Sequence, residues 1–393
     1  MKLGFSPTEE AFRAEAASWL KDALSGPFAD LRGVTSLIAL PERRREWERH
    51  LGAARWSCVG WPAAYGGRDA TLAQQVIFAE EYARAGGPAR LNHVGIELAG
   101  PTILAFGTAA QKDRFLPAIA AGEEIWCQGY SETNAGSDLA AVRTRAWREE
   151  GVWLVEGQKV WTSLAQFSDW IFVLARSEEG SRGRNGLSFL LVPMDQPGVT
   201  VRHIHQMTGE AEFNETFFDA ARTEGSNILG APGDGWTIAT ALLGLERGVS
   251  TLGQQMGFRN ELDAVIDAAR RNGAAADPLI RQRIARAEIG LRLMRYGALR
   301  MLTAAEDGSM SPAALTYKIQ WASWRQALGE LAMDVLGQEG EIAAGDDYAF
   351  PLLPNLFLYS RADTIYGGTN EIQRNIIAER ALGLPREPRG DRQ

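Results

Sequence analysis

The chain has 393 residues, of which 45% are hydrophobic and 23% are charged, and its formal net charge is −8 at pH 7. This length exceeds what one hydrophobic core supports, so two or three packed subdomains are expected. The arginines are scattered, no apolar run reaches the roughly 18 residues of a membrane span, and the two cysteines match no metal motif. We therefore expect an enzyme without a metal, a nucleic-acid partner or a membrane span. The polar N-terminus does not resemble a signal peptide, so a cytoplasmic location is expected.

The first part of the chain, residues 1–122, is predicted to be a helical domain. Ser6-Pro7, followed by two glutamates, is typical of a helix start, because proline fits the first turn and acidic side chains favour the positive end of the helix dipole. Residues 71–82 continue with helical spacing of apolar positions. Gly86-Gly87-Pro88 then ends this run.

From about Ile125 the sequence changes to short β-branched and aromatic runs separated by polar turns, which predicts strands. These runs cover residues 152–155, 170–174, 187–192, 198–201 and 215–218. We assign residues 123–230 to a central β domain.

The helical period returns after Gly235, where Ile238, Leu242, Leu245, Val249 and Leu252 lie on one stripe of a predicted long helix. Further helices are predicted over residues 255–272, 278–305, 311–336 and 370–382. Residues 231–385 are assigned to a C-terminal helical domain and 386–393 to a polar tail. The order of helices, sheet and helices places the chain in the α+β class.

Two motifs identify a family when they occur in this order. Residues 129–138 read GYSETNAGSD and residues 366–375 read YGGTNEIQRN. Together they closely resemble the acyl-CoA dehydrogenase family of flavoproteins, and Lys159-Val160-Trp161-Thr162-Ser163 resembles its Lys-x-Trp-x-Thr/Ser signature. The resemblance covers essentially the whole chain. It implies an N-terminal helical domain, a central β domain, and a C-terminal four-helix-bundle domain that also forms the oligomer core.

The resemblance also implies a cofactor, a substrate and partners. The cofactor is FAD, the substrate is an acyl-CoA, and the electron acceptor is an electron-transfer flavoprotein. The assembly is a homotetramer or a heterotetramer with a related subunit.

The resemblance further assigns roles to individual residues. Flavin contacts are assigned to Gln128 and Ser131, to Trp161 and Ser163, to Thr369 and Glu371, and to Gln282. Ser137 is expected near the pantetheine of the substrate. Taken alone, the first motif also fits a tight turn between strands, and an aromatic residue in a β domain is usually only core.

The catalytic base of this family occupies one of two positions. The first is the residue after the tyrosine of the C-terminal motif, which here is Gly367; the second lies on the long helix after the β domain, which here carries Glu246. Glu246 shares a helix face with apolar Leu242 and Val249, and apolar surroundings raise the pKa of a carboxylate toward neutrality. The alternative is a glutamate that pairs with a cation or faces solvent.

The mechanism implied by the resemblance is α,β-dehydrogenation. Glu246 removes the α-proton of the acyl-CoA while the β-hydrogen leaves as hydride to flavin N5. The Gly367 N–H and the flavin ribityl chain bond the thioester carbonyl. Arg247 matches a position that contacts CoA, although a structural ion pair is an equal alternative.

Some features depart from the family pattern. The segment around Gln282 lacks the Phe-Gly of the Arg-x-x-Phe-Gly sequence that reaches a neighbouring subunit's flavin. These departures, with a glutamate at 246 and none at 367, resemble a bacterial subgroup that includes subunits of heteromeric dehydrogenases of steroid side-chain CoA esters. Two other functions stay open: a non-catalytic or partner-dependent subunit, and an oxygen-reactive oxidase or monooxygenase on the same fold.

Overall fold

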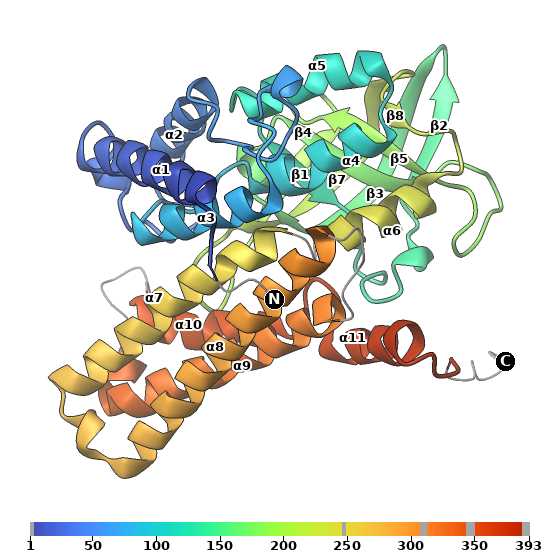
Figure 1. The fold of residues 1–393 in the computed structure, drawn as a ribbon. Helices are drawn as coiled ribbons and strands as arrows, with labels where there is room; N and C mark the ends of the chain where they lie inside the picture. Colours follow the sequence, from blue (N-terminus) through green and yellow to red (C-terminus); the bar gives the residue numbers. More distant parts are fainter. Residues whose placement is uncertain (1–3, 246–248, 307–312, 343–349, 387–393) are drawn as a thin grey trace, which may run out of the picture. The chain divides into compact units, whose positions relative to one another are not determined.

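The computed structural model describes residues 4–245, 249–306, 313–342 and 350–386. The chain forms two compact units (Figure 1). The larger unit comprises Thr8–Gln206 and Glu210–Ser250, and the smaller comprises Met1–Pro7, Met207–Gly209 and Thr251–Gln393. The predicted order of helices, sheet and helices is confirmed. The domain boundaries at residues 122 and 230 stay predictions.

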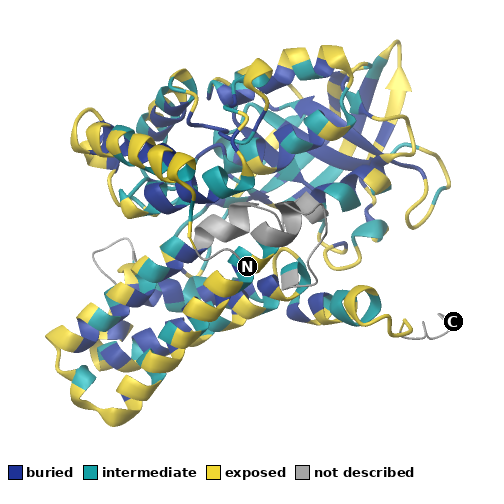
Figure 2. Ribbon diagram, in the orientation of Figure 1, coloured by how far each residue is buried: buried dark blue, intermediate teal, exposed yellow. Residues whose placement is uncertain are grey.

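The N-terminal part of the larger unit is helical. Its α-helices are α1 (Pro7–Ser25), α2 (Pro41–Ala53), α3 (Leu72–Arg84), α4 (Gly100–Phe106) and α5 (Ala109–Ala120). Helix α1 begins at Pro7 as predicted, and α3 begins with a capping box between Thr71 and Gln74. A π-helical turn, Gly95–Ala99, leads into α4. Figure 2 shows exposed residues along the outer side of α1 and buried residues in the strands of the same unit.

Eight strands form one sheet in the larger unit. They are β1 (Trp126–Gly129), β2 (Arg145–Glu149), β3 (Val152–Ser163), β4 (Trp170–Arg176), β5 (Leu187–Pro193), β6 (Val199–Ile204), β7 (Phe213–Glu224) and β8 (Ile228–Leu229). Their order is β6-β7-β3-β2-β4-β5-β8, and β1 pairs with β4 in parallel. The long β3–β7 pair is antiparallel and matches two of the predicted runs, although both strands extend beyond them.

Both faces of strands β4 and β5 are buried, which explains their nearly continuous apolar sequences. Because successive side chains point to opposite faces, Phe172 packs in a cluster with residues of α4, α5 and α6 (Gly235–Leu245), and Ile171 packs in a second cluster with residues of β3 and β7. Cys127 lies in the second cluster and Cys58 in the first, and both thiols are free and buried.

The smaller unit is helical, as predicted. Its helices are α7 (Val249–Arg271), α8 (Pro278–Glu306), α9 (Ala313–Leu336), α10 (Leu352–Asp363) and α11 (Asn370–Ile376), followed by a π-helical turn, Ile377–Ala381. Helices α7, α8, α9 and α10 contribute to one apolar core, in which Leu262, Met294 and Ala332 are fully buried. This core is the expected helical bundle.

Candidate active site

Strand β3 presents an exposed tryptophan on a strained segment. The β3–β7 register shifts between Lys159 and Thr162, and Trp161 within that irregularity has φ of 62°. Its side chain is 57% exposed and its ring meets Phe213 edge-on, with centroids 6.0 Å apart. A left-handed backbone is unusual for a bulky residue and persists where the surroundings fix it, often at a functional site. The irregularity therefore holds a flat apolar ring toward solvent.

Unused polar side chains occur close to Trp161 in the fold. The loop after β1 lies against β3, because the Val160 N–H donates to the Ser131 carbonyl over 2.9 Å. Gln128 on β1, Ser131 in this loop and Ser163 at the end of β3 are all half-buried. Within the described ranges, none of these three side chains has a hydrogen-bond partner. An apolar platform with unused donors and acceptors suits a planar ligand with polar edges.

The loop that carries Ser131 also carries Ser137. Residues 131–143 form the loop in the connection between β1 and β2. Ser137 lies on the exposed part of this loop. The predicted cofactor residues Gln128, Ser131, Trp161 and Ser163 thus come from two neighbouring elements of one unit, and Ser137 is six positions along the same loop from Ser131.

The smaller unit carries the other predicted residues. Gly367 and Gly368 turn the chain with φ of 62° and 87°, which glycine adopts without the steric cost of a side chain. Gly367 is exposed. Thr369 caps α11, where its hydroxyl oxygen accepts from Ile372 N over 3.2 Å. Glu371 is exposed in the first turn of α11, and hydrogen bonds to its own backbone and to Thr369 hold its pKa below the usual value.

A charge network that no sequence pattern predicted lies beside this glycine turn. Arg325 on α9 donates to Glu261 over 2.8 Å and to Asp363 over 3.1 Å. The Tyr366 hydroxyl donates to Asp363 over 2.8 Å, and the Gln373 amide donates to the Gly367 carbonyl over 2.9 Å. Burial raises the pKa of Asp363, against the opposing effect of Arg325. The network fastens the turn 364–368 to α7 and α9.

Three predicted residues remain. Gln282 is exposed on α8. Glu246 and Arg247 lie outside the described residues. Among the residues that the structure describes, no cluster of histidine, cysteine and acidic side chains is suited to a metal ion, and no helix is long and apolar enough to cross a membrane.

His93 in the larger unit has the environment of a structural residue. Its Nδ1 lies 3.2 Å from the Arg90 carbonyl oxygen, and burial lowers its pKa. Arg90 in turn binds the fully buried Glu48.

Three family models match consecutive parts of the chain. They describe the N-terminal, middle and C-terminal domains of acyl-CoA dehydrogenases and match residues 6–123, 127–221 and 233–382, respectively. The chain belongs to the acyl-CoA dehydrogenase family. The expected fold and enzyme class are thereby confirmed, and the family is one of flavoproteins.

Individual acyl-CoA dehydrogenases are similar over nearly the whole chain. Acyl-CoA dehydrogenase IpdE1 of Mycobacterium tuberculosis is 54% identical, covering 97% of this chain and 99% of the relative. The solved Tcur3481-Tcur3483 steroid ACAD is 28% identical with a TM-score of 0.86, covering 98% and 100% of the two chains. The ChsE4-ChsE5 complex from Mycobacterium tuberculosis is 30% identical with a TM-score of 0.82, again covering 98% and 100%.

Proposed function

We propose that this acyl-CoA dehydrogenase binds FAD and converts an acyl-CoA thioester to the trans-2-enoyl-CoA. The observation that carries the proposal is the exposed Trp161 ring on its strained segment, close in the fold to side chains whose polar groups have no partner among the described residues. A surface of this kind suits a ligand that covers the ring and uses these hydrogen-bonding groups.

FAD fits these residues because its isoalloxazine ring is planar and carries polar atoms along its edge. Trp161 would pack on this ring, and Gln128, Ser131 and Ser163 would bond its edge. Thr369, Glu371 and Gln282 are proposed as further cofactor contacts of the same chain or of its neighbour. When bound, the cofactor supplies the oxidising power of the reaction by accepting the β-hydrogen of the substrate as hydride.

The protein supplies the base and the stabilisation of negative charge. Glu246 removes the α-proton, and the Gly367 N–H donates to the thioester carbonyl oxygen, where negative charge develops as the proton leaves. Among the described residues, a β-carbon added at Gly367 would meet only Lys318 Cε, at 3.8 Å, so the glycine leaves space on this side of the turn. Ser137 and Arg247 are proposed to contact the CoA part of the substrate.

The substrate is proposed to be a bulky CoA ester of the steroid-derived type, since a structurally similar dehydrogenase is described as a steroid ACAD. A related subunit is the proposed partner, because the ChsE4-ChsE5 relative is a complex. Helix α8 carries exposed Ile289, Leu293 and Tyr296 at helical spacing, which supports burial of this face by another subunit. An electron-transfer flavoprotein is the proposed electron acceptor.

An anaerobic titration tests the reaction. The purified protein is titrated with short, branched and steroid-type acyl-CoAs while the visible flavin absorption is followed. Bleaching by steroid-type esters is the expected result, and bleaching only by short esters would overturn the substrate class. If the chain alone retains no flavin, the same titration with a co-expressed related subunit distinguishes a partner-dependent subunit from an inactive protein.

Replacing the exposed ring tests the cofactor site separately. Trp161→Ala is expected to weaken FAD binding about 2- to 13-fold, since an aromatic contact contributes about 0.5–1.5 kcal/mol. The unfolding free energy is expected to change by less than about 0.5 kcal/mol because the side chain is largely exposed. Fluorescence titration of apoprotein with FAD measures the first quantity. Exposed Trp147 on β2 provides the matched control, Trp147→Ala, for which unchanged FAD affinity is expected.

A further inference from the structure

A fully buried lysine lies two residues before Trp161. The Lys159 ammonium on β3 donates to the Glu132 carboxylate and to the Leu174 carbonyl, each over 2.8 Å, and to the Tyr130 carbonyl over 3.0 Å. Three acceptors satisfy its three N–H donors. One ammonium thus joins β3, β4 and the end of β1.

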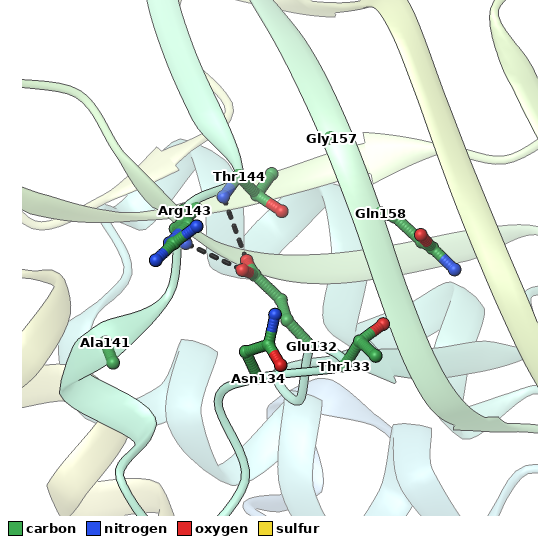
Figure 3. Close-up of a pocket in the computed structure, with 8 residues that line it drawn as sticks. All are labelled: Glu132, Thr133, Asn134, Ala141, Arg143, Thr144, Gly157 and Gln158. Atoms are coloured by element: carbon green, nitrogen blue, oxygen red, sulfur yellow. Dashed lines mark hydrogen bonds between the residues drawn. The ribbon is translucent and has the colours of Figure 1, made fainter.

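Glu132, the partner of this lysine, closes the loop in which it lies. One carboxylate oxygen accepts from Arg143 N over 2.7 Å and the other accepts from Thr144 N over 2.9 Å (Figure 3). These contacts connect the beginning of the loop 131–143 to its end. The end of the loop packs closely against β3, because a β-carbon added at Gly157 on β3 would lie 2.6 Å from the Thr144 hydroxyl.

Other contacts hold the middle of the loop: Glu132 and Ala135 exchange two backbone hydrogen bonds of 3.0 Å, and Arg176 donates to the Ala140 and Val142 carbonyls. Ala135 and Val142 are buried, whereas residues 133–134 and 136–138 are exposed. Ser131 immediately precedes Glu132, and its carbonyl is bonded by the residue that follows Lys159. The ion pair therefore joins the two elements of the proposed flavin contact, the loop at Ser131 and strand β3 at Trp161.

We propose that the buried Glu132–Lys159 pair is a positioning device that holds loop 131–143 against β3 in the conformation that receives the flavin. The proposal rests on the proposed function, because it takes Ser131 and Trp161 as cofactor contacts. The pair contacts no reacting atom; it acts through the backbone of the loop.

The ionisation of the pair agrees with this role. Burial lowers the pKa of Lys159 to about 8, against the opposing effect of Glu132, so the ammonium persists at pH 7. Burial alone would raise the pKa of Glu132, but Lys159 and the two backbone N–H donors hold it below the usual value. A buried pair of opposite charges costs desolvation energy and is weak evidence for added stability, and some buried pairs instead specify one conformation, which is the role proposed for this pair.

Two variants of the full chain test the proposal. Lys159→Met removes the ammonium, and Glu132→Gln keeps the size of the side chain while one N–H donor of the loop loses its acceptor. Arg145→Met is the control, because Arg145 forms an exposed pair with Glu156 of β3 over 2.7 Å. Hydrogen exchange of residues 131–143 and of β5 is measured in the apoprotein, and FAD affinity is measured by fluorescence titration.

In both variants we expect hydrogen exchange of the loop to be about 10- to 100-fold faster. The dissociation constant for FAD is expected to rise by a similar factor. Both factors follow because a hydrogen bond to a charged group contributes about 1.5–3 kcal/mol. Exchange in β5 is expected to stay unchanged, and the control to resemble the parent protein. Equal acceleration in the loop and β5, or unchanged FAD affinity in a folded variant, would overturn the proposal. If Lys159→Met does not fold, Glu132→Gln alone decides. If the parent chain binds no FAD either alone or with a co-expressed related subunit, the proposed function fails, whereas the loop exchange still tests the pair.

Discussion

Glu246→Gln is expected to lower the turnover of acyl-CoA by about 10²- to 10⁴-fold, the usual effect of losing a general base. Glutamine has nearly the size of glutamate but accepts no proton at neutral pH. The other position at which this family carries its base is Gly367, which has no side chain to replace it. Steady-state rates with the substrate identified by titration measure the effect.

The same variant is expected to bind FAD and substrate as the parent does, because the proposed role of Glu246 is confined to proton removal. A loss of bound flavin would indicate a structural role instead. Glu330→Gln is the control, since Glu330 is an exposed glutamate on α9 that pairs with Arg361. Turnover equal to that of this control would show that the base lies elsewhere in the assembly, including in a partner subunit.

Arg325→Met is expected to lower the unfolding free energy by about 3–5 kcal/mol, because removing one member of a buried charge pair leaves its partner uncompensated. The Asp363 side chain is fully buried, so its carboxylate would keep only the Tyr366 hydroxyl among the side-chain donors described here. Glu261 on α7 would lose the same guanidinium. Urea unfolding followed by helical circular dichroism measures the loss.

The control for this charge network is Arg283→Met. Arg283 pairs with Asp334 on the surface, where the side chains are 37% and 55% exposed, and exposed pairs contribute at most about 1 kcal/mol. Equal losses for the two variants would show that the buried network is no more stabilising than a surface pair. Faster hydrogen exchange of residues 364–370 is expected only in Arg325→Met.

Much of the fold was predictable because the spacing of apolar residues agrees along the chain with the residues that start and end helices and strands. Pro7 begins α1, and the apolar run at 187–192 lies within a strand that is buried on both faces. The π-helical turns at Gly95–Ala99 and Ile377–Ala381 were not predictable. An extra residue in one turn leaves no periodic trace in so short a segment.

The candidate site was predicted in its residues but not in its conformation. Ser131, Trp161 and Ser163 were named from motifs, whereas the left-handed backbone of Trp161 depends on the β3–β7 register, which no local pattern reveals. Lys159 and Glu132 stood inside those motifs without a role. Their separation of 27 positions hides a contact that only the folded sheet produces.

The two buried cysteines can report how often the larger unit opens. Burial raises the pKa of Cys58 and of Cys127 to about 12, so neither thiol forms an appreciable amount of thiolate at neutral pH. Both belong to the larger unit and the sequence has no other cysteine. An alkylating reagent would therefore modify the protein only at the moments when this unit opens. The rate of modification reports that opening without any label having to be introduced.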